Sequence, residues 1–311
     1  MITLRQLNYA LAVERHLHFK NAAEDCSVSQ SALSTAISEL EKQLGFMIFE
    51  RDNKRVLITP AGQAVLNKAR TIKLQLDDLY KLAETQHSPL SFPITIGIIP
   101  TIAPFLLPIV LPAIKKAYPQ LELTVQEAQS HELVHAVKEG DIDTAILALP
   151  YDIEGLLSFE FWQEDFYWIS HKDDAKPGQS EVSATDLLEA RLMLLKDGHC
   201  LKDQALAVCR FEGNNQHELS ATSLNTLIQM VLGRLGSTLV PQMALESLVG
   251  NYIELNAMRL SEPSPHRRIA CIIRPGYAGL KNVELLIDLF KQEMNAHAKW
   301  EYSLSILFLE P

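Results

Sequence analysis

The sequence predicts an α/β multidomain chain, with an N-terminal winged helix-turn-helix unit, a long linker helix and two sequential α/β lobes. Three observations support this fold class. The chain has 311 residues, too many for one ordinary core, so two or three compact units are expected. Its first part combines short amphipathic helices with a polar turn. From Pro93 onward, strand-like runs alternate with helical ones.

Composition limits the function classes. Hydrophobic residues make up 47% and charged residues 21%, as in an ordinary soluble globular protein. No apolar run approaches the roughly 18–20 residues of a membrane span, and the N-terminus lacks a secretory signal pattern. The sequence therefore predicts a cytoplasmic protein without a membrane partner. The four cysteines are expected to be reduced there, so that any disulfide would be transient.

The distribution of charge matters more than the net charge of −10. Residues 1–75 hold ten Lys and Arg against seven Asp and Glu, whereas the other residues hold 18 basic and 31 acidic groups. A basic end on an acidic body favours an N-terminus that faces nucleic acid.

Three helices are predicted in the N-terminal unit. Apolar spacing gives a first helix over 4–16 and a short second helix over 19–26. Ser29 is a candidate N-cap for the third helix, which runs over 30–44 before Gly45 ends it. A tight turn between two helices of this kind is typical of a helix-turn-helix motif.

A DNA-binding surface follows from this motif. Polar side chains at the start of the third helix could reach base edges in a major groove, and basic side chains in a small β wing over 49–59 suit phosphate contacts. The candidate residues are Ser29, Gln30, Ser31, Ser34, Arg51, Lys54 and Arg55. The alternative interpretation is a three-helix core with a solvated polar face.

Residues 61–86 are predicted to form one long helix with an apolar seam, which needs a partner. Two prolines in 87–93 indicate a hinge. We thus expect domains at 1–60, 61–86, 87–93 and 94–311.

The C-terminal unit is predicted to have two lobes, with the cleft between them as the default ligand site. The first lobe would hold about 94–163 and 268–300, and the second about 164–267. The sequence contains no Gly-rich phosphate loop and no Gly-x-Ser-x-Gly, and it predicts neither an enzyme nor a cofactor. The spacing of Cys200 and Cys209 is not that of a zinc site, and no metal site is predicted.

Cys200 and Cys209 lie nine residues apart. If this segment is helical, the spacing corresponds to a rise of about 13–14 Å and a turn of about 900°, which places the thiols on opposite faces. A disulfide needs Cα atoms about 4.4–6.8 Å apart. The two sulfurs can therefore bond only if the local fold is rebuilt. The alternative is that both are inert packing residues.

The N-terminal residues resemble the winged helix-turn-helix signature of LysR-type transcriptional regulators. The similarity is carried by Phe19, Ala22-Ala23, Ser29-Gln30, Ser34, Ile37, Leu40-Glu41, Leu44-Gly45, Phe49, Arg51 and Thr59-Pro60-Ala61-Gly62. The resemblance implies promoter DNA as a partner, a dimerising linker helix and a regulatory domain similar to periplasmic binding proteins. It also implies a homotetramer and makes RNA polymerase a candidate partner.

Within that class, residues 196–205 together with Cys209 are similar to the sensor segment of peroxide-responsive members. The resemblance implies that hydrogen peroxide oxidises Cys200, that Cys209 resolves the product to a disulfide, and that a cellular thiol reductant resets it. The expected peroxide pocket consists of Thr101, Ser130, His199, Lys202, Asp203 and Arg274. Ser130 stands where threonine is common, and Lys202 stands where arginine is common, so the bidentate fork is lost there.

Elementary chemistry supports the same hypothesis. A helix that starts near Cys200 would stabilise a thiolate at its N-terminus. A sulfenic acid formed there condenses with a nearby thiol to a disulfide. Two alternatives stay open: a LysR-type regulator that binds a small carboxylate in the cleft, and a thiol peroxidase.

Overall fold

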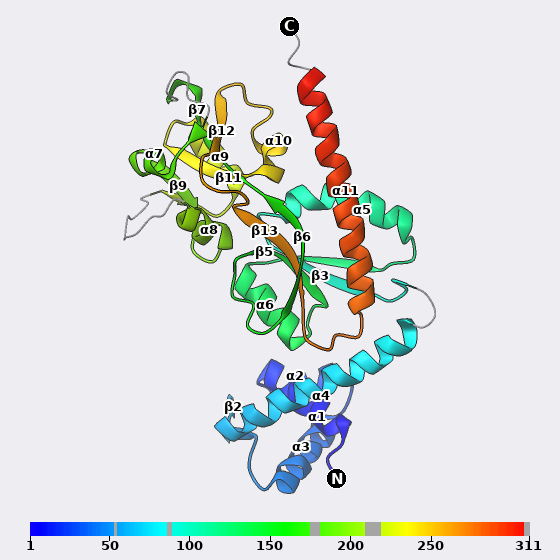
Figure 1. Ribbon diagram of the computed structural model, residues 1–311. Coiled ribbons are helices and arrows are strands. Elements are labelled where there is room, and N and C mark those ends of the chain that lie inside the picture. The colour runs from blue at the N-terminus through cyan, green and yellow to red at the C-terminus, as the bar shows by residue number, and fades with distance from the viewer. Residues whose placement is uncertain (53–54, 86–88, 175–180, 209–218, 308–311) are drawn as a thin grey trace. The chain divides into compact units, whose positions relative to one another are not determined.

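The protein is described from a computed structural model that covers residues 1–52, 55–85, 89–174, 181–208 and 219–307 (Figure 1). The chain divides into two compact units, Met1–Ala83 and Glu84–Pro311, and each is described by itself.

Helices α1 (Leu4–His16), α2 (Phe19–Asp25) and α3 (Gln30–Leu44) begin the N-terminal unit. Each begins at a polar cap: the Thr3 hydroxyl accepts from the Gln6 amide, and the Ser29 hydroxyl accepts from the Ala32 amide. Gly45 ends α3 with a φ of 81°, as the sequence predicted. The wing consists of β1 (Phe49–Asp52) and β2 (Arg55–Ile58), which pair antiparallel.

The core of this unit is formed by the apolar faces of the three helices and by the base of the wing. Phe19 of α2 and Phe49 of β1 meet edge to face, with ring centroids 6.2 Å apart. The Glu41 carboxylate accepts from the amides of Ile48 and Phe49. These contacts fix the wing against α3.

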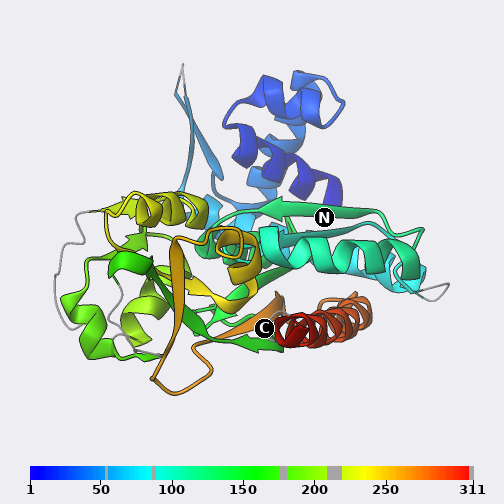
Figure 2. The same cartoon turned by 90° about the horizontal axis from the view of Figure 1, so that it is seen from above.

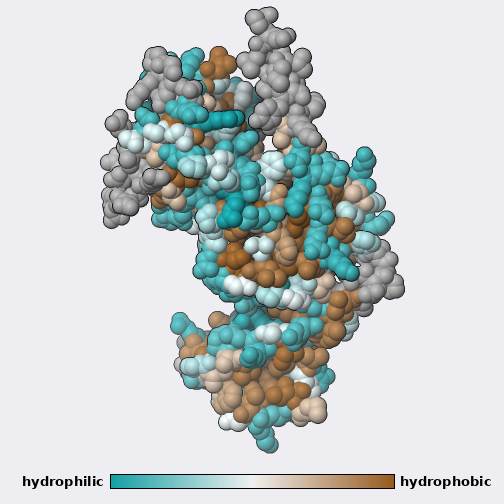
Figure 3. Space-filling model, in the orientation of Figure 1, coloured by the Kyte–Doolittle hydropathy of each residue, from teal (hydrophilic) through white to brown (hydrophobic). Residues whose placement is uncertain are grey.

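Helix α4 (Pro60–Thr85) divides its apolar seam between two environments. Leu66 and Ala69, in its first half, are buried in the core of the N-terminal unit. Further along, Ile72 and Leu79 are exposed, Leu79 by 62%. Apolar surface is visible along this half of α4 in Figure 3.

The C-terminal unit contains two sheets. The first has the strand order β4-β3-β5-β13-β6, and the second has the order β10-β9-β11-β7-β12-β8. The strands of the first sheet are β3 (Ile94–Ile98), β4 (Leu123–Glu127), β5 (Thr144–Leu149), β6 (Leu157–Glu164) and β13 (Arg267–Ile273). The strands of the second are β7 (Phe166–His171), β8 (Glu181–Val182), β9 (Leu192–Leu195), β10 (Ser220–Ala221), β11 (Ser237–Pro241) and β12 (Leu255–Leu260).

Helices cover both faces of the first sheet, which together with them forms the first lobe. Helices α5 (Ala103–Ala117) and α11 (Leu280–Leu307) lie side by side on one face, and α6 (Ser130–Glu139) packs against the other (Figures 1 and 2). The connection from β3 through α5 to β4 steps one way across the sheet, and the connection from β4 through α6 to β5 steps back the other way. Because both crossovers are right-handed, their helices lie on opposite faces.

The second lobe is built around the second sheet. Its helices are α7 (Ala184–Glu189), α8 (Cys200–Val208), α9 (Leu224–Leu232) and α10 (Leu245–Leu248), with short 3₁₀ turns at Lys172–Asp174 and Gln242–Ala244. The chain passes between the lobes after β6 and again before β13. The predicted fold class, an α/β multidomain chain with a winged helix-turn-helix unit and a two-lobed unit, is confirmed.

The segment predicted as a hinge is partly built into the first lobe. Leu90 and Phe92 are buried in its core, and the Leu90 amide donates to Oδ1 of Asn282 at 3.2 Å. Residues 89–93 are therefore held in place by packing. No helix in the described part of the chain is long and apolar enough to span a membrane.

Candidate functional site

The candidate sensor site lies at the carboxyl edge of the parallel strands of the first lobe. Thr101 follows β3, Ser130 opens α6 after β4, and Ala148 lies at the end of β5. Because β3, β4 and β5 are parallel, their carboxyl ends meet at the same edge of the sheet, where open α/β sheets bind ligands.

Cys200 connects this edge to the second lobe. It is the first residue of α8, and its thiol is free and only 3% exposed. Its side chain packs in the core of the first lobe, whereas the next residue, Leu201, packs in the core of the second. The start of α8 is therefore embedded in both lobes at once.

Opposing effects act on the thiol. Burial raises the pKa of Cys200 above its ordinary value. A hydrogen bond from Ser130, the positive charge of Arg267 and the backbone of Ala148 lower that pKa. Burial prevails, so the net shift of the Cys200 pKa is upward, whereas the position at a helix N-terminus was expected to lower it. The lowering groups favour the anion once the proton leaves.

Arg267 organises the polar side of the site. This first residue of β13 is 1% exposed and pairs with Glu164, its Nε and Nη2 each 2.7 Å from Oε1. Its Nη1 donates to the Thr101 hydroxyl and its Nη2 to the Thr101 carbonyl, both at 3.2 Å. The other Glu164 oxygen accepts from the Met243 amide of the second lobe. Arginine's rigid fork suits such multiple contacts.

Ser130 and Thr101 are both buried at this edge. The Thr101 oxygen accepts from Arg267, which leaves its hydroxyl proton to be donated. The Ser130 oxygen has no nitrogen or oxygen partner among the described residues, so its proton can reach the sulfur of Cys200. Both hydroxyls are thus oriented as donors.

The three predicted pocket residues next to Cys200 lie in different environments. His199 is buried, and this burial lowers the pKa of its imidazole, which makes it a neutral group at pH 7 rather than a source of charge. Lys202 forms an ion pair with Asp197 in the loop before α8. Asp203 is exposed, and its charge raises the pKa of Cys200. Lys202 and Asp203 therefore do not supply positive charge or donors to the thiol.

The structure does not bring Arg274 to the thiol. Arg274 follows the far end of β13, and β13 runs antiparallel to β5 with Arg268 opposite Leu149 and Ile272 opposite Ala145. Arg267 thus lies at the carboxyl edge of the sheet. Arg274 lies at the amino edge, about 24 Å along the strand at 3.4 Å per residue, with its guanidinium 4.7 Å from the ring centroid of Tyr277. The predicted arginine is replaced by Arg267.

Two residues fix the position of α8. Buried Gln204 donates from Nε2 to the carbonyl of Ala148 at 3.0 Å and to that of Pro150 at 3.4 Å. Gly198, just before α8, has a φ of +96°, and a Cβ there would lie 2.1 Å from Oε1 of Gln129. The positive φ favours glycine here, and any side chain would in addition require the Gln129 side chain to move.

The other cysteines differ from Cys200. Cys209 lies outside the described residues. Cys271 is buried inside β13, where burial raises the pKa of its thiol to about 12. Cys26 is half-buried beside the core of the N-terminal unit, and burial raises its pKa as well. Within the described residues, no three His, Cys, Asp or Glu side chains lie close enough to hold a metal ion.

The candidate DNA-binding residues occupy the start of α3 and the wing. Ser29, Gln30 and Ser31 are exposed, and the hydroxyls of Ser29 and Ser31 lie 3.1 Å apart. Ser34 is half-buried in the same helix. Arg55 is exposed at the start of β2. Arg51 belongs to β1, but its side chain and the whole of Lys54 lie outside the described part of the chain.

The sequence prediction missed Arg267, Glu164, Gln204 and Tyr151. Burial raises the pKa of the Tyr151 hydroxyl, and negative charge on Cys200 raises it further. Tyr151 therefore lies near the thiol. A signal for Arg267 exists: two consecutive arginines precede a buried apolar strand, and strand alternation turns one of them inward. Gln204 carried no such signal.

Two family descriptions match the chain. Residues 4–63 match the bacterial regulatory helix-turn-helix protein, lysR family, and residues 88–295 match the LysR substrate binding domain. Together these matches confirm the resemblance on which the sequence interpretation was based.

Full-length relatives agree with these matches. The chain is 38% identical to the HTH-type transcriptional regulator EstR of Acinetobacter baylyi, over 93% of this chain and 96% of the relative. It is 36% identical to the hydrogen peroxide-inducible genes activator of Dickeya chrysanthemi, over 95% of this chain and 97% of the relative. The structure of full-length OxyR from Pseudomonas aeruginosa superposes with a TM-score of 0.76 at 30% identity, covering 94% of this chain and 95% of that one.

Proposed function

This chain belongs to the LysR family of bacterial helix-turn-helix regulators, and we propose that it senses hydrogen peroxide through Cys200 and thereby changes its binding to promoter DNA. The relatives by themselves leave the signal open, since EstR and the peroxide-inducible activator are similarly close in identity. The surroundings of Cys200 favour peroxide.

One observation carries the proposal: a free thiol sits at the junction of both lobes, among groups that act on its anion. Ser130 and Arg267 lower the pKa of Cys200 against the effect of burial. These groups stabilise negative charge at the moment when sulfur attacks and the proton has left. Thr101, held by Arg267, offers a hydroxyl to the departing oxygen. A buried cluster of a thiol and polar donors of this kind suits reaction with peroxide.

The chemistry has two steps. The Cys200 thiolate attacks one peroxide oxygen, the O–O bond breaks, and the other oxygen leaves as hydroxide, which takes up a proton to become water. Sulfur is oxidised to the sulfenic acid and peroxide is reduced. The thiol of Cys209 then attacks the sulfenic sulfur, which forms the disulfide and releases a second water. A cellular dithiol returns Cys200 and Cys209 to thiols by thiol–disulfide exchange and is itself oxidised to a disulfide.

Helix α8 turns this chemistry into a structural change. Residues Cys200–Val208 are helical, a rise of about 12 Å between the first and last Cα atoms. The next Cα after Val208 is only about 3.8 Å further along the chain, too short a step to bring it from about 12 Å to within the roughly 6.8 Å of the Cys200 Cα that a disulfide needs. Disulfide formation therefore requires α8 to unwind. Because α8 begins inside both lobes, unwinding loosens the contact between them.

The output would be a dimer that binds promoter DNA. The exposed apolar residues of α4, Ile72 and Leu79 among them, suit pairing with a second copy of this helix. The exposed start of α3 suits insertion into a major groove, and Arg55 suits a phosphate contact. A tetramer and a contact with RNA polymerase extend the same proposal. The cytoplasm, where promoter DNA and thiol reductants are available, is the compartment that it requires.

The test combines mass spectrometry with DNA footprinting on full-length protein. After one equivalent of peroxide, we expect a Cys200–Cys209 disulfide and an altered footprint. Cys200→Ser is expected to abolish both changes. Cys271→Ser is the matched control, since Cys271 is equally buried but lies within a strand, and this variant should respond like the unaltered chain.

Other results would contradict the proposal. A disulfide without any change in footprint would remove the regulatory role. A normal inducer response in Cys200→Ser would favour a regulator that binds a small carboxylate in the cleft. Peroxide consumption over many turnovers per subunit with a cellular reductant would favour a thiol peroxidase.

A further inference from the structure

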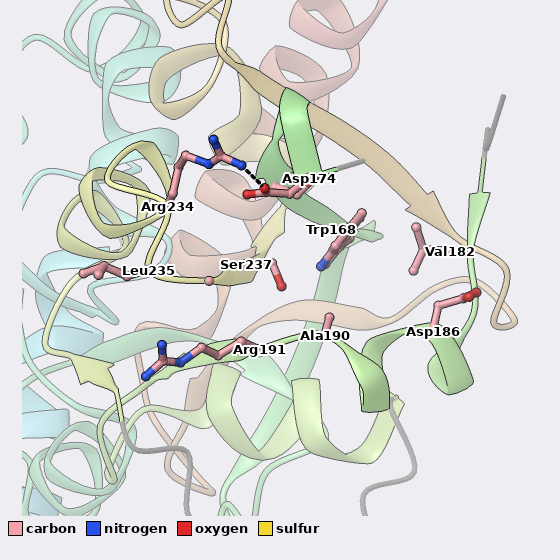
Figure 4. Close-up of a pocket in the computed structure, with 11 residues that line it drawn as sticks. Trp168, Asp174, Val182, Asp186, Ala190, Arg191, Arg234, Leu235 and Ser237 are labelled. Carbon is pink, nitrogen blue, oxygen red and sulfur yellow. Dashed lines mark hydrogen bonds and ion pairs between the residues drawn. The ribbon is translucent and has the colours of Figure 1, made fainter. Parts of the chain in front are cut away.

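A second cavity lies within the second lobe, apart from Cys200. It has a volume of about 410 Å³, within the range of small-molecule sites in proteins. Residues of the sheet, of the segment before β9 and of the loop before β11 line it (Figure 4). None of the residues around Cys200 borders it.

The pairing of β7 and β11 gathers three polar groups on one wall of this cavity. Trp168 and Ser170 are two residues apart on β7, so their side chains emerge on the same face of the sheet. Thr238 pairs with Ile169, which places Ser237 opposite Ser170 and hence on that face too. Trp168 and Ser237 turn their polar atoms toward the space between them in Figure 4.

These three groups have no hydrogen-bond partner within the described residues. Nε1 of Trp168, Oγ of Ser170 and Oγ of Ser237 are all buried and unpaired there. Buried polar groups are otherwise satisfied almost everywhere in proteins, and an unsatisfied one destabilises the fold. The indole N–H can only donate, and both hydroxyls can donate, so the wall offers three donors to one acceptor group.

The charged residues that line the cavity are engaged with each other or with caps. Arg234 pairs with Asp174, and the Asp186 carboxylate accepts from the amide and hydroxyl of Ser183. Arg191 adds a further positive charge to the lining. Asp174 is thus paired with a positive charge, and Asp186 with hydrogen-bond donors. The wall that carries the three unpaired donors faces an apolar volume bordered by Val182 and Leu235.

We propose that this cavity binds a small organic acid, with its carboxylate on Trp168, Ser170 and Ser237 and its apolar body in the remaining volume. A carboxylate has two oxygens with about four acceptor positions, which three converging donors match better than they match a single carbonyl. This site does not depend on the peroxide proposal, because no atom of it belongs to the Cys200 pocket.

The position of the site gives its ligand a route to the sensor segment. The Ser237 amide donates to the carbonyl of Arg191 at 2.9 Å, and Ser237 pairs with Leu192 at the start of β9. The chain leaves the other end of β9 directly into the loop that precedes Cys200. A ligand on Ser237 therefore contacts the strand that positions α8, and the cavity could supply a second input to the same lobe.

The test uses calorimetric titration of full-length protein with phenylacetate and with hexanoate, which carry an aromatic and an aliphatic body. We expect one saturable site per chain for at least one acid, and binding at least tenfold weaker for the corresponding neutral amide. Trp168→Phe, Ser170→Ala and Ser237→Ala should each weaken binding by about tenfold. The three variants remove separate atoms, so misfolding of one leaves the others informative.

Two controls fix the location. Trp162→Phe makes the same substitution on β6 of the first lobe and should leave binding unchanged. Cys200→Ser should also bind as the unaltered chain does. The absence of saturable binding of either acid up to about 10 mM would overturn the proposal. So would equal affinity in all three cavity variants, equal affinity for acid and amide, or loss of binding in Cys200→Ser.

Discussion

Gln204 holds α8 against the first lobe, so its replacement is expected to release the sensor helix. In Gln204→Glu the side chain keeps its size, but a carboxylate cannot donate to the carbonyls of Ala148 and Pro150 that Gln204 now contacts at 3.0 and 3.4 Å. Two hydrogen bonds are lost, each worth about 1 kcal/mol. The docked state of α8 therefore loses about 2 kcal/mol, and burial of the new charge adds to this.

A loss of about 2 kcal/mol corresponds to an increase of about 30-fold in the undocked population. Hydrogen exchange measured in the reduced protein should show protection of the α8 amides falling by that factor, while the strands of both sheets keep theirs. If unwinding of α8 limits the second chemical step, conversion of the sulfenic acid to the disulfide should accelerate to a similar extent in quenched-flow mass spectrometry.

Lowering the pH tests whether the introduced charge and the lost donor cause the loss of α8 protection. Burial against two carbonyls raises the pKa of the introduced carboxyl, and the protonated form can donate one hydrogen bond again. Protection of α8 should therefore recover partly as the pH falls through that pKa. Gln229→Glu is the matched control, because Gln229 is exposed on α9 and its side-chain amide donates to the Tyr252 hydroxyl, away from α8. Unchanged α8 protection in Gln204→Glu, or equal loss in the control, would refute the reasoning.

Four further outcomes are expected. Arg267→Lys keeps the charge but loses the fork, and should slow oxidation of Cys200 by peroxide about tenfold in stopped-flow assays; an unchanged rate would exclude its role. Because burial raises the pKa of the thiol, the oxidation rate should rise about tenfold per pH unit below that pKa, and Ser130→Ala should shift the rise to higher pH. Gly198→Ala forces a clash at a positive φ and should lower the free energy of unfolding by about 1–3 kcal/mol in denaturant titrations. Arg55→Ala should reduce the slope of log affinity against log salt by about one in DNA titrations, and an unchanged slope would remove the phosphate contact.

Local patterns in the sequence predicted the elements whose burial is uniform or whose ends are capped. Helix α1 was predicted over its observed range, and β9 consists of four consecutive apolar residues that are all buried. Strand β12 carries no clear pattern of this kind, because Leu255–Leu260 mixes apolar with polar residues and lacks turn signals at its ends. Its identity as a strand comes from pairing with β7, a contact between distant segments.

In the candidate site, too, the sequence predicted what neighbouring residues determine but not what contacts between distant segments determine. Cys200 could be predicted because its neighbours along the chain carry the resemblance, and the helix expected from that position begins at Cys200 itself. Arg274 was placed in the pocket and Arg267 was missed because only the register with β5 shows which end of β13 meets the thiol. Lys202 was placed in the pocket by the resemblance, but its side chain pairs with Asp197.

The start of α8 is a point at which the cores of the two lobes meet, and this determines what oxidation can do. Adjacent residues on α8 belong to different cores, Cys200 to the first and Leu201 to the second, so no rigid movement of α8 can satisfy a new bond at Cys200 without disturbing Leu201. The Glu164–Arg267 pair lies at the same junction and connects Thr101 to Met243 of the second lobe. Chemistry at the sulfur therefore acts on the packing that sets the relation between the lobes. A peroxide of two oxygens binds through too few contacts to shift a conformational equilibrium far, whereas a covalent bond that is incompatible with α8 excludes the docked state altogether.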